Sequence, residues 1–390
     1  MRGMGDLPRL LVISHPSVTP TNQSFFAAVS AVSHWQVSMI IPAQWRTEYG
    51  PIRAQRWPAF TGELITAPVL GQGSIPLHVY WFRMRAFMRR HRFRAIYVHN
   101  EPYALSTLQA FVANRMSERV PIGFYAAQNI AKVYPQPFRA FERWVLDNAD
   151  FAFPVTHSAL SVLRDKGFGA LAPLLPLAID FDVYHPSAHA RASVRGSLGI
   201  DEDVVLFGYV GRLVEEKGLL TAVRALCMLP KTVSWHMAFV GDGPLRPALG
   251  AAIEASGRSD RFSLVGYVAH DAVARWIGAL DVLVLPSESR PNWKEQFGRV
   301  LLEAWACGVP VVGSDSGEIP HLIELCRGGL VFREGDHEML ADSLERLARD
   351  RLLRTNLATA GQEAVRVEFG QDTLAAKFAE TLDVVSGLHR

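Results

Sequence analysis

Cysteine is scarce in this sequence, and long uninterrupted apolar runs are absent. The cysteines are Cys227, Cys307 and Cys326. They lack the spacing of metal ligands and lie among apolar or small residues, so we expect buried free thiols rather than disulfides or a metal site. The longest apolar run, 280–286, is broken by Asp281 and is too short to cross a bilayer. Residues 1–6 have no signal-peptide core. These absences predict a cytoplasmic protein.

Charge of one sign does not dominate the chain, but it is unevenly divided. The net charge is +2, and 49% hydrophobic with 20% charged residues indicates a globular protein large enough for two domains. Residues 1–185 carry 18 Lys and Arg against 11 Asp and Glu, whereas residues 186–390 carry 22 against 27. Without a recognisable binding motif, this near-neutral chain is not expected to bind nucleic acid.

The basic half contains one conspicuous stretch. Residues 80–94 place six arginines among aromatic side chains. This pattern is typical of an interfacial helix on anionic lipid, and a solvated surface helix has the same pattern. The stretch therefore leaves both a peripheral membrane contact and an ordinary surface open, and only the first would place the protein at the inner face of the cell membrane.

Short apolar segments alternate with helical ones along the chain. We expect strands at 10–13, 37–41, 95–98, 122–125, 151–155 and 171–175, and again at 204–210, 236–240, 262–265, 282–285, 309–313 and 330–332. This predicts an α/β protein with two doubly wound Rossmann-like domains, 1–185 and 186–372. We expect a helix at 373–390 to pack back on the first domain, and ligands to bind in a cleft between the domains.

Two glutamates eight positions apart give the first indication of function. If a helix begins at Phe297, Glu295 lies just before it and Glu303 about two turns along, nearly on the same face. Carboxylates accept hydrogen bonds from vicinal hydroxyls, so the pair suits sugar recognition. Two glutamates on a solvated helix face would have the same spacing. This helix is apolar nearly all round, however, so a carboxylate at Glu303 needs a ligand or a partner.

A turn that carries two cations follows the strand at 204–210. It reads Gly211-Arg212-Leu213-Val214-Glu215-Glu216-Lys217-Gly218. Arg212 can donate two hydrogen bonds to two oxygens of one phosphate, and Lys217 can place a positive charge beside the next phosphate. The N-terminus of the next helix adds its dipole. A surface turn could have the same sequence, so the indication depends on the neighbouring loops.

These loops together resemble the nucleotide-binding domain of the family 4 retaining glycosyltransferases, which have the GT-B fold and belong to glycosyl transferases group 1. The matching segments are Gly211–Leu213, Glu216–Gly218, Val240–Pro244, Gly266–Val268, Asp281–Val282, Pro286–Ser287 and Glu295–Glu303, followed by Ala304, Ala306, Gly308 and Pro310. Their order and spacing agree over about residues 200–335. The resemblance implies a GT-B protein whose second domain binds a nucleotide-sugar donor and whose first domain binds the acceptor.

The resemblance also implies a role for each matching residue. The expected catalytic residues are Glu295, Arg212 and Lys217, and the expected donor-binding residues are Gly211, Val268, Phe297, Gly298 and Glu303. Arg212 and Lys217 would hold the diphosphate, and Glu295 the hydroxyls of the donor sugar. Glu303 would bind the ribose, and the backbone near Val268 would meet the base.

The first domain departs from the family pattern at two loops. Residues 14–23 contain no Gly-Gly pair, and residues 126–129 contain no histidine. Candidate contacts to the sugar or the acceptor are Asn22, His99 and Gln128. Gln128 can hydrogen-bond a sugar but cannot act as a base, and a lone histidine at a strand end is often structural. In the second domain Gly317-Glu318 stands where family members have Gly-Gly.

The expected function is retaining transfer of a sugar to a lipid-linked or polysaccharide acceptor in cell-envelope glycan synthesis. The cations Arg212 and Lys217 would neutralise the leaving diphosphate, so we expect neither a metal nor another cofactor. Asp180 and Asp182 lie in the connection between the domains, away from a carboxylate-rich strand end, and are expected to be structural.

Other functions remain open. A GT-B-like sugar epimerase or phosphorylase would share the fold but use different catalytic groups, and a non-catalytic partner subunit would explain the missing Gly-Gly and histidine. A dinucleotide oxidoreductase is disfavoured because no strand is followed by Gly-x-Gly-x-x-Gly. A serine hydrolase is disfavoured because the chain lacks Gly-x-Ser-x-Gly.

Overall fold

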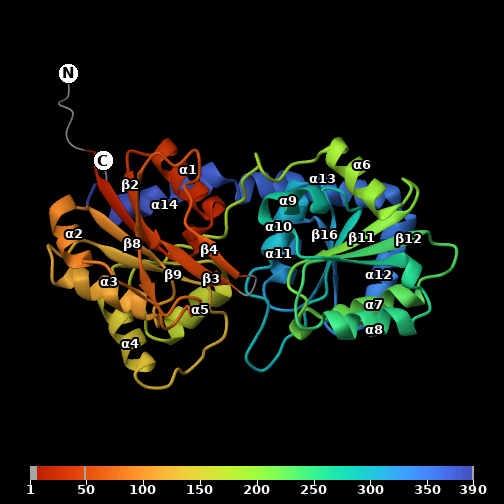
Figure 1. The fold of residues 1–390 in the computed structure, drawn as a ribbon, viewed down its shortest axis with the longest axis horizontal. Coiled ribbons are helices and arrows are strands. Elements are labelled where there is room, and N and C mark those ends of the chain that lie inside the picture. Colours follow the sequence, from red (N-terminus) through yellow and green to blue (C-terminus); the bar gives the residue numbers. More distant parts are fainter. Residues whose placement is uncertain (1–6, 48–49, 389–390) are drawn as a thin grey trace. The chain divides into compact units, whose positions relative to one another are not determined.

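In the computed structural model the chain divides into two compact units (Figure 1). Unit 1 comprises residues 1–178 and 371–390, and unit 2 comprises residues 179–370. The structure describes residues 7–47 and 50–388, apart from the side chains of 270 and 271. The first border lies seven residues before the expected one at 185, because Ile179 already belongs to unit 2. Its N–H donates to the carbonyl of Phe369 at 2.9 Å.

Unit 1 is built on a parallel sheet of six strands in the order β10-β9-β8-β1-β2-β5. The strands are β1 (Arg9–Ser14), β2 (Gln36–Pro42), β5 (Glu63–Ala67), β8 (Ala95–His99), β9 (Ile122–Ala126) and β10 (Phe151–Pro154). The strand expected at 171–175 is wrong, since Leu171 makes only an isolated bridge to Phe151. Pro173 and Pro176 explain this, because proline has no N–H to donate to a sheet.

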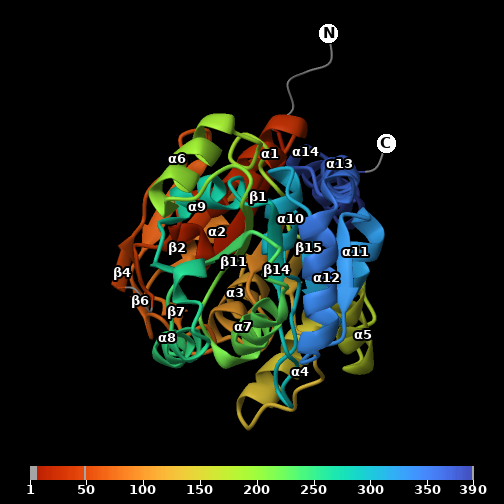
Figure 2. The ribbon, with the colours of Figure 1, turned by 90° about the vertical axis from the view of Figure 1, so that its right-hand side faces the viewer.

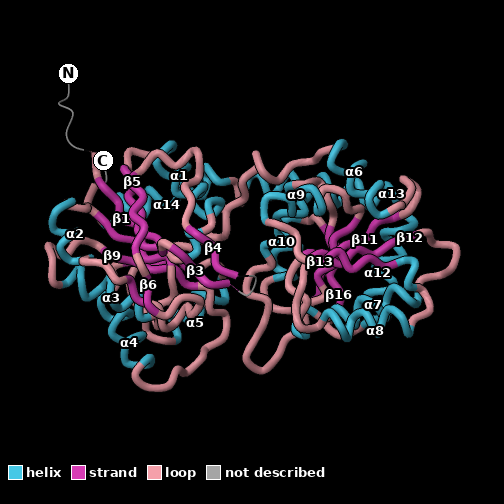
Figure 3. The backbone as a smooth tube through the Cα atoms, in the orientation of Figure 1, coloured by secondary structure: helices cyan, strands magenta, loops and turns pink. Residues whose placement is uncertain are grey.

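Helices cover both faces of the unit 1 sheet (Figure 3). They are α1 (Ser24–Val32), α2 (Met84–His91), α3 (Leu105–Arg115), α4 (Phe138–Asn148), α5 (His157–Asp165) and α14 (Gln371–Val385). Alternate side chains of β1 enter two separate apolar clusters, with Leu10 in one and Leu11 in the other. The C-terminal helix α14 packs beside α1 and contributes Phe378, whose ring stacks on Phe153 at 4.8 Å between centroids.

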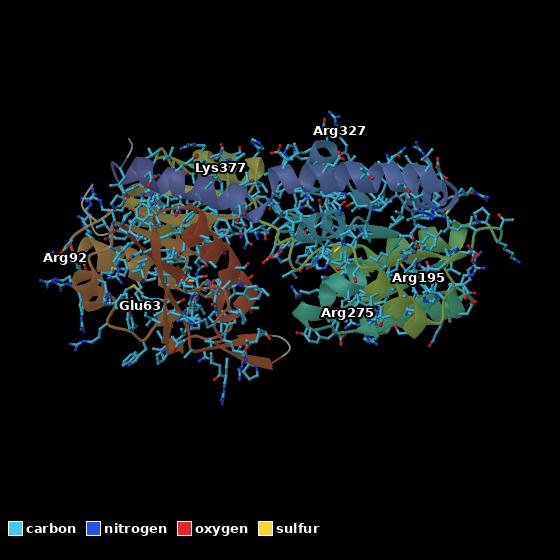
Figure 4. All side chains as sticks on the ribbon, turned by 90° about the horizontal axis from the view of Figure 1, so that it is seen from above. Glu63, Arg92, Arg195, Arg275, Arg327 and Lys377 are labelled. Carbon is cyan, nitrogen blue, oxygen red and sulfur yellow. The ribbon has the colours of Figure 1, made fainter. Side chains whose placement is uncertain are left out.

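The basic stretch at 80–94 forms a shorter helix than its sequence suggests. Tyr80 belongs to β7 (Val79–Tyr80), which pairs with β6 (Val69–Leu70), and α2 begins only at Met84. Met84 and Met88 face the core. All six arginines are exposed, and Figure 4 shows Arg92, just after α2, pointing away from unit 1.

Unit 1 also contains a second antiparallel pair, formed by β3 (Gln44–Thr47) and β4 (Gly50–Arg53).

Unit 2 contains a second parallel sheet, in the order β13-β12-β11-β14-β15-β16. Its strands are β11 (Val205–Val210), β12 (Trp235–Val240), β13 (Phe262–Gly266), β14 (Val282–Leu285), β15 (Val311–Ser314) and β16 (Gly329–Phe332). All six expected strands of this half are present. Their apolar runs are explained by burial, because a parallel sheet is covered on both faces.

Two layers of helices flank this sheet. The helices of unit 2 are α6 (Ala188–Leu198), α7 (Leu219–Met228), α8 (Arg246–Ala255), α9 (His270–Ile277), α10 (Arg299–Ala306), α11 (Ile319–Cys326), α12 (His337–Arg349) and α13 (Arg351–Glu368). Helix α7 contacts α8 and α12, whereas α9 contacts α6 and α10, and α10 contacts α13. Figure 2 shows α12 standing beside the strand β15. Within the part of the chain that is described, no helix is both long and apolar enough to cross a membrane.

Candidate active site

The predicted donor residues of unit 2 lie on loops at one edge of its sheet. Because all the strands are parallel, the loops after β11, β12, β13, β14 and β15 leave the sheet at its carboxyl edge, where ligands bind in open α/β sheets. The loop 211–218 follows β11, and the loop 286–298 follows β14. These two strands are hydrogen-bonded neighbours, so the loops that they deliver lie next to each other.

Glycines let these loops approach one another closely. A Cβ on Gly218 would stand 1.9 Å from the carbonyl oxygen of Pro286, and one on Gly241 would stand 1.9 Å from that of Gly211. A Cβ on Gly317 would stand 2.0 Å from the carbonyl oxygen of Glu295. All three have positive φ angles, at +61°, +136° and +57°, which other residues adopt only with strain. The edge is therefore an assembly of closely packed loops, in which these three glycines leave no room for a Cβ.

Lys217 and Glu295 form an ion pair in this assembly. Lys217 is in the 3₁₀ turn Glu215–Lys217, and its Nζ lies 2.5 Å from Oε2 of Glu295. The same oxygen accepts a hydrogen bond of 2.8 Å from Oγ of Ser287. Glu295 is only 7% exposed. Burial of a carboxylate is costly unless it is paired, so Lys217 and Ser287 together account for its position.

An aromatic ring lies beside the ammonium of Lys217. Nζ of Lys217 lies 5.1 Å from the ring centroid of Trp293. Trp293 is partly exposed and is fixed by two backbone hydrogen bonds with Arg290, of 2.7 and 3.1 Å. An ammonium at this distance is attracted by the ring face. Lys217 is thus held on one side by a carboxylate and on another by an indole.

Glu303 is held by a different partner. Its Oε1 lies 3.1 Å from Nε of Arg299, one turn earlier on α10. Glu303 is 7% exposed, and Arg299 is the partner that the sequence requires for a carboxylate in this apolar helix. The expected helix start at Phe297 is two residues early, because α10 begins at Arg299 after Gly298 with φ +74°. Glu295 therefore lies in the preceding loop.

The other predicted donor residues lie on the same sheet edge. Arg212 is exposed, and its carbonyl accepts a hydrogen bond of 2.7 Å from Oη of Tyr209. Gly211 donates its N–H to the carbonyl of Val240 at 3.0 Å, which ties the loop after β11 to the end of β12. Val268 is half-buried in the loop after β13. Phe297 is buried and meets Phe369 edge to face at 6.3 Å between centroids.

The candidate contacts of unit 1 lie at the carboxyl edge of its own sheet. Asn22 is in the 3₁₀ turn Pro20–Gln23 after β1, and its side chain donates to the carbonyl of Pro16 at 2.8 Å. His99 ends β8 and stacks on Tyr125 of β9 at 4.6 Å between centroids. Gln128 follows β9 and is half-buried. Since β9, β8 and β1 are adjacent in the sheet, the structure brings these loops to one place.

The titratable groups at this edge of unit 1 have strongly shifted pKa values. The pKa of His15 is lowered to about 3, mainly by burial and also by the nearby His78 and His99. Burial also lowers the pKa of His78, and lowers that of His99 to about 4. Glu101 is buried, which raises its pKa to about 7 although its carboxylate accepts the N–H of Ala127 at 2.8 Å. At neutral pH the three histidines are therefore uncharged.

We expect acid to destabilise the protein through these histidines. An unfolded histidine binds a proton below about 6.5, whereas His99 remains neutral until about 4 and His15 until about 3. The unfolded state thus binds more protons in this window, so the free energy of unfolding decreases as the pH is lowered. Glu101 acts in the opposite direction between about 4.5 and 7, but it is one group against three. Urea unfolding at several pH values checks this: the loss on acidification should be smaller in His99→Gln and larger in Glu101→Gln, and identical profiles would contradict it.

Sequence reasoning missed several partners within the site. Nothing in the spacing of Ser287 and Trp293 indicated that Ser287 bonds Glu295 or that Trp293 lies beside Lys217. Arg299 could have been predicted as the partner of Glu303 from their (i, i+4) spacing.

All three cysteines are free thiols, with Cys307 and Cys326 buried and Cys227 partly exposed.

Residues 190–364 match the sequence model of one family, glycosyl transferases group 1. A GDP-mannose-dependent alpha-(1-6)-phosphatidylinositol monomannoside mannosyltransferase of Mycobacterium tuberculosis is 33% identical over 222 residues, which cover 56% of this chain and 57% of that protein. The lipopolysaccharide core biosynthesis glycosyltransferase LpsE of Rhizobium meliloti is 31% identical over 48% of this chain and 52% of its own length. The chain thus matches somewhat more than half the length of these curated relatives.

Solved structures share the fold over nearly the whole chain. Sucrose-phosphate synthase from Thermosynechococcus elongatus has a TM-score of 0.76 at 20% identity, covering 98% of this chain and 100% of that one. HepE of Anabaena, solved in complex with UDP, has a TM-score of 0.73 at 20% identity, covering 97% and 100%. The chain therefore has the α/β fold of the GT-B class, with two Rossmann-like domains, and its residues 190–364 carry the match to glycosyl transferases group 1.

Proposed function

We propose that the protein is a retaining glycosyltransferase, which moves a sugar from a nucleotide-diphosphate donor to a lipid-linked or polysaccharide acceptor in cell-envelope glycan synthesis. One observation carries the proposal: the buried carboxylate of Glu295 holds Lys217 at the carboxyl edge of the unit 2 sheet. A carboxylate that can accept from sugar hydroxyls and an ammonium that can meet a phosphate are thereby fixed side by side. A nucleotide-sugar donor carries the partners of both, sugar hydroxyls and a diphosphate, on one molecule.

The proposed chemistry needs charge placed at the leaving group. As the bond from the anomeric carbon to the diphosphate breaks, negative charge builds on the departing phosphate oxygen. Lys217 and Arg212 would neutralise it, and positive charges fixed in advance cost no reorganisation during the reaction. The acceptor hydroxyl would attack from the face that the diphosphate leaves, giving up its proton to the departing phosphate. We propose that this requires neither a metal nor a protein nucleophile.

The carboxylate of Glu295 would orient the sugar. Its Oε2 is engaged by Lys217 and Ser287, but a carboxylate offers about four lone-pair directions. We propose that the carboxylate accepts hydrogen bonds from two neighbouring sugar hydroxyls when the donor binds. Because Ser287 and the backbone of Gly317 fix the residue from two sides, the carboxylate would hold the sugar in one orientation.

The relatives support the acceptor part of the proposal. The mycobacterial relative is named as a transferase of mannose to a phosphatidylinositol mannoside, and other relatives are named for lipopolysaccharide core and teichuronic acid biosynthesis. Each of these names refers to a glycolipid or a glycan. We propose an acceptor of this class here, bound by the unit 1 loops that carry Asn22, His99 and Gln128.

A screen of nucleotide-sugars by thermal shift tests the donor assignment. A ligand at a hundred times its dissociation constant should stabilise the protein by about 2.7 kcal/mol. Nucleoside diphosphates and their sugar conjugates should raise the melting temperature, and nucleosides should not. If no nucleotide-sugar binds, the proposal is wrong. Binding followed by epimerisation or phosphorolysis would favour the enzyme alternatives, and binding without any turnover would favour a non-catalytic partner.

Glu303→Gln should weaken donor binding more than it slows the reaction. If Glu303 accepts from both ribose hydroxyls, the amide replaces one acceptor by a donor and loses about 1–2 kcal/mol, so KM for the donor should rise about tenfold while kcat changes little. Glu345→Gln is the matched control, since Glu345 forms a similar (i, i+4) pair with Arg349 at 2.7 Å on α12. Equal KM values in the two variants would contradict the assignment of Glu303 to the ribose.

A further inference from the structure

An apolar groove runs between α2 and α3 in unit 1, and its lining includes none of Asn22, His99 and Gln128. It has a volume of about 780 Å³, which lies within the ~300–1,000 Å³ typical of small-molecule sites. Its floor is formed by Phe82, Met84, Leu105, Leu108, Val112 and Met116. Val112 is 39% and Met116 53% exposed, so the groove is open along its length.

Helix α3 and its C-cap residue turn apolar side chains toward the groove. Leu108, Val112 and Met116 recur at helical spacing on the groove side. The face that is buried in unit 1 carries Phe111 but also the polar Ser106, Thr107 and Asn114. This polarity is unusual for a helix on a sheet, where the exposed face is normally the polar one. An exposed apolar face of this kind indicates a binding surface.

Positive charge borders the groove without a balancing carboxylate. Arg83, Arg85 and Arg89 line it, and no acidic residue does. Arg85 closes one end by donating to the carbonyl of Met116 at 2.8 Å. Within residues 7–47 and 50–388, neither Arg83 nor Arg89 forms an ion pair. The occupant should therefore have an apolar part and an anionic part.

Exposed apolar side chains continue from one end of the groove. Trp81 is 72% exposed and Leu77 50% exposed, and they flank Val79, which lines the groove. The carbonyl of Pro76 accepts the N–H of Leu105 at 3.0 Å, which fixes this segment at the start of α3. Tryptophan with neighbouring arginines is the composition found at the boundary between lipid headgroups and acyl chains.

We propose that the α2–α3 groove binds one acyl chain of an anionic phospholipid in a membrane, with the lipid phosphate between Arg83 and Arg89. Trp81 and Leu77 then enter the headgroup boundary of the same leaflet. The inference adds a lipid site to the proposed function and concerns unit 1 alone. Its test contains no nucleotide or acceptor, so its failure would leave the glycosyltransferase proposal standing.

Sedimentation with vesicles tests the charged part of the site. The full chain should bind vesicles of phosphatidylglycerol and phosphatidylcholine, and bind phosphatidylcholine alone much more weakly. Arg83→Gln with Arg89→Gln should weaken binding about 30-fold, since each arginine at a membrane surface contributes about fivefold. Arg90→Gln with Arg92→Gln is the matched control, because it removes the same charge from the same segment outside the groove, and it should weaken binding clearly less. Equal losses would show a diffuse basic surface and overturn the proposal.

Substitution of the groove floor tests the acyl chain. Val112→Glu should abolish vesicle binding, and Val112→Leu should preserve it. Because Val112 is substantially exposed, both variants should fold, which their melting temperatures will show. In Val112→Trp, vesicles with brominated acyl chains should quench more fluorescence than in the parent protein. Unchanged binding by Val112→Glu, or no added quenching, would contradict an acyl chain in the groove. Absence of any vesicle binding by the parent protein would do the same.

Discussion

Lys217→Ala is expected to lower sugar transfer at least about 100-fold while the protein stays folded, because a preorganised cation at the leaving diphosphate is typically worth this much. The variant also leaves the buried carboxylate of Glu295 with Ser287 as its remaining side-chain partner among those described above. The stability cost should be about 1–3 kcal/mol. Initial rates at saturating donor, together with urea unfolding, measure the two effects separately.

The matched control for this prediction is Lys166→Ala. Lys166 pairs with Glu142 of unit 1 at 2.6 Å, and the two side chains are 17% and 9% exposed. The Lys217–Glu295 pair is almost equally buried, at 19% and 10%. Both variants should therefore lose similar stability, whereas only Lys217→Ala should lose binding of the nucleoside diphosphate. Near-normal turnover by Lys217→Ala would remove the basis of the donor assignment.

Gly218→Ala is expected to destabilise unit 2 by more than about 4 kcal/mol and to abolish donor binding. Its methyl group would stand 1.9 Å from the carbonyl oxygen of Pro286. Backbone atoms cannot yield as a flexible side chain can, so the loops after β11 and β14 must separate. Lys217 precedes Gly218 directly, and this separation would take it away from Glu295. Circular dichroism during heating and the yield of folded protein measure the effect.

Gly199→Ala separates steric overlap from backbone strain. Gly199 has a φ of +66°, close to the +61° of Gly218, but nothing lies within 4 Å of its missing Cβ. The two substitutions therefore share the cost of a left-handed alanine, about 1–2 kcal/mol, and differ only in what the methyl group meets. If Gly199→Ala proves as damaging as Gly218→Ala, close packing of the loops does not hold the site together.

The sequence predicted unit 2 better than unit 1, and the difference has a physical reason. The strands of unit 2 are continuous apolar runs such as 205–210, which are distinctive because both faces of the sheet are buried. In unit 1 the run 171–175 is equally apolar, yet Pro173 within it and Pro176 just after it prevent it from joining the sheet. Strand β5, which reads Glu-Leu-Ile-Thr-Ala, was missed because it lies at the sheet edge and mixes polar with apolar residues.

The candidate site could be located from sequence, but its internal pairing could not. The sequence predicted that Lys217 and Glu295 lie on loops at the same edge of the sheet, because the loops after parallel strands leave the sheet at one edge. It could not show that they contact each other 78 positions apart in the chain, because that depends on the conformation of the 286–298 loop. The pairing of Glu303 with Arg299 is local and could have been predicted from their (i, i+4) spacing. The burial of Glu101 in unit 1 follows from tertiary packing and could not.

In the proposed function, Lys217 meets the diphosphate and Glu295 meets the sugar of one donor. Calorimetry tests it with a nucleoside diphosphate and its nucleotide-sugar, titrated into the parent protein, Lys217→Ala and Glu295→Gln. We predict that Lys217→Ala weakens binding of both ligands, whereas Glu295→Gln weakens the nucleotide-sugar at least about tenfold more than the nucleoside diphosphate. Parent-like affinities of both variants for both ligands would contradict these roles of Lys217 and Glu295.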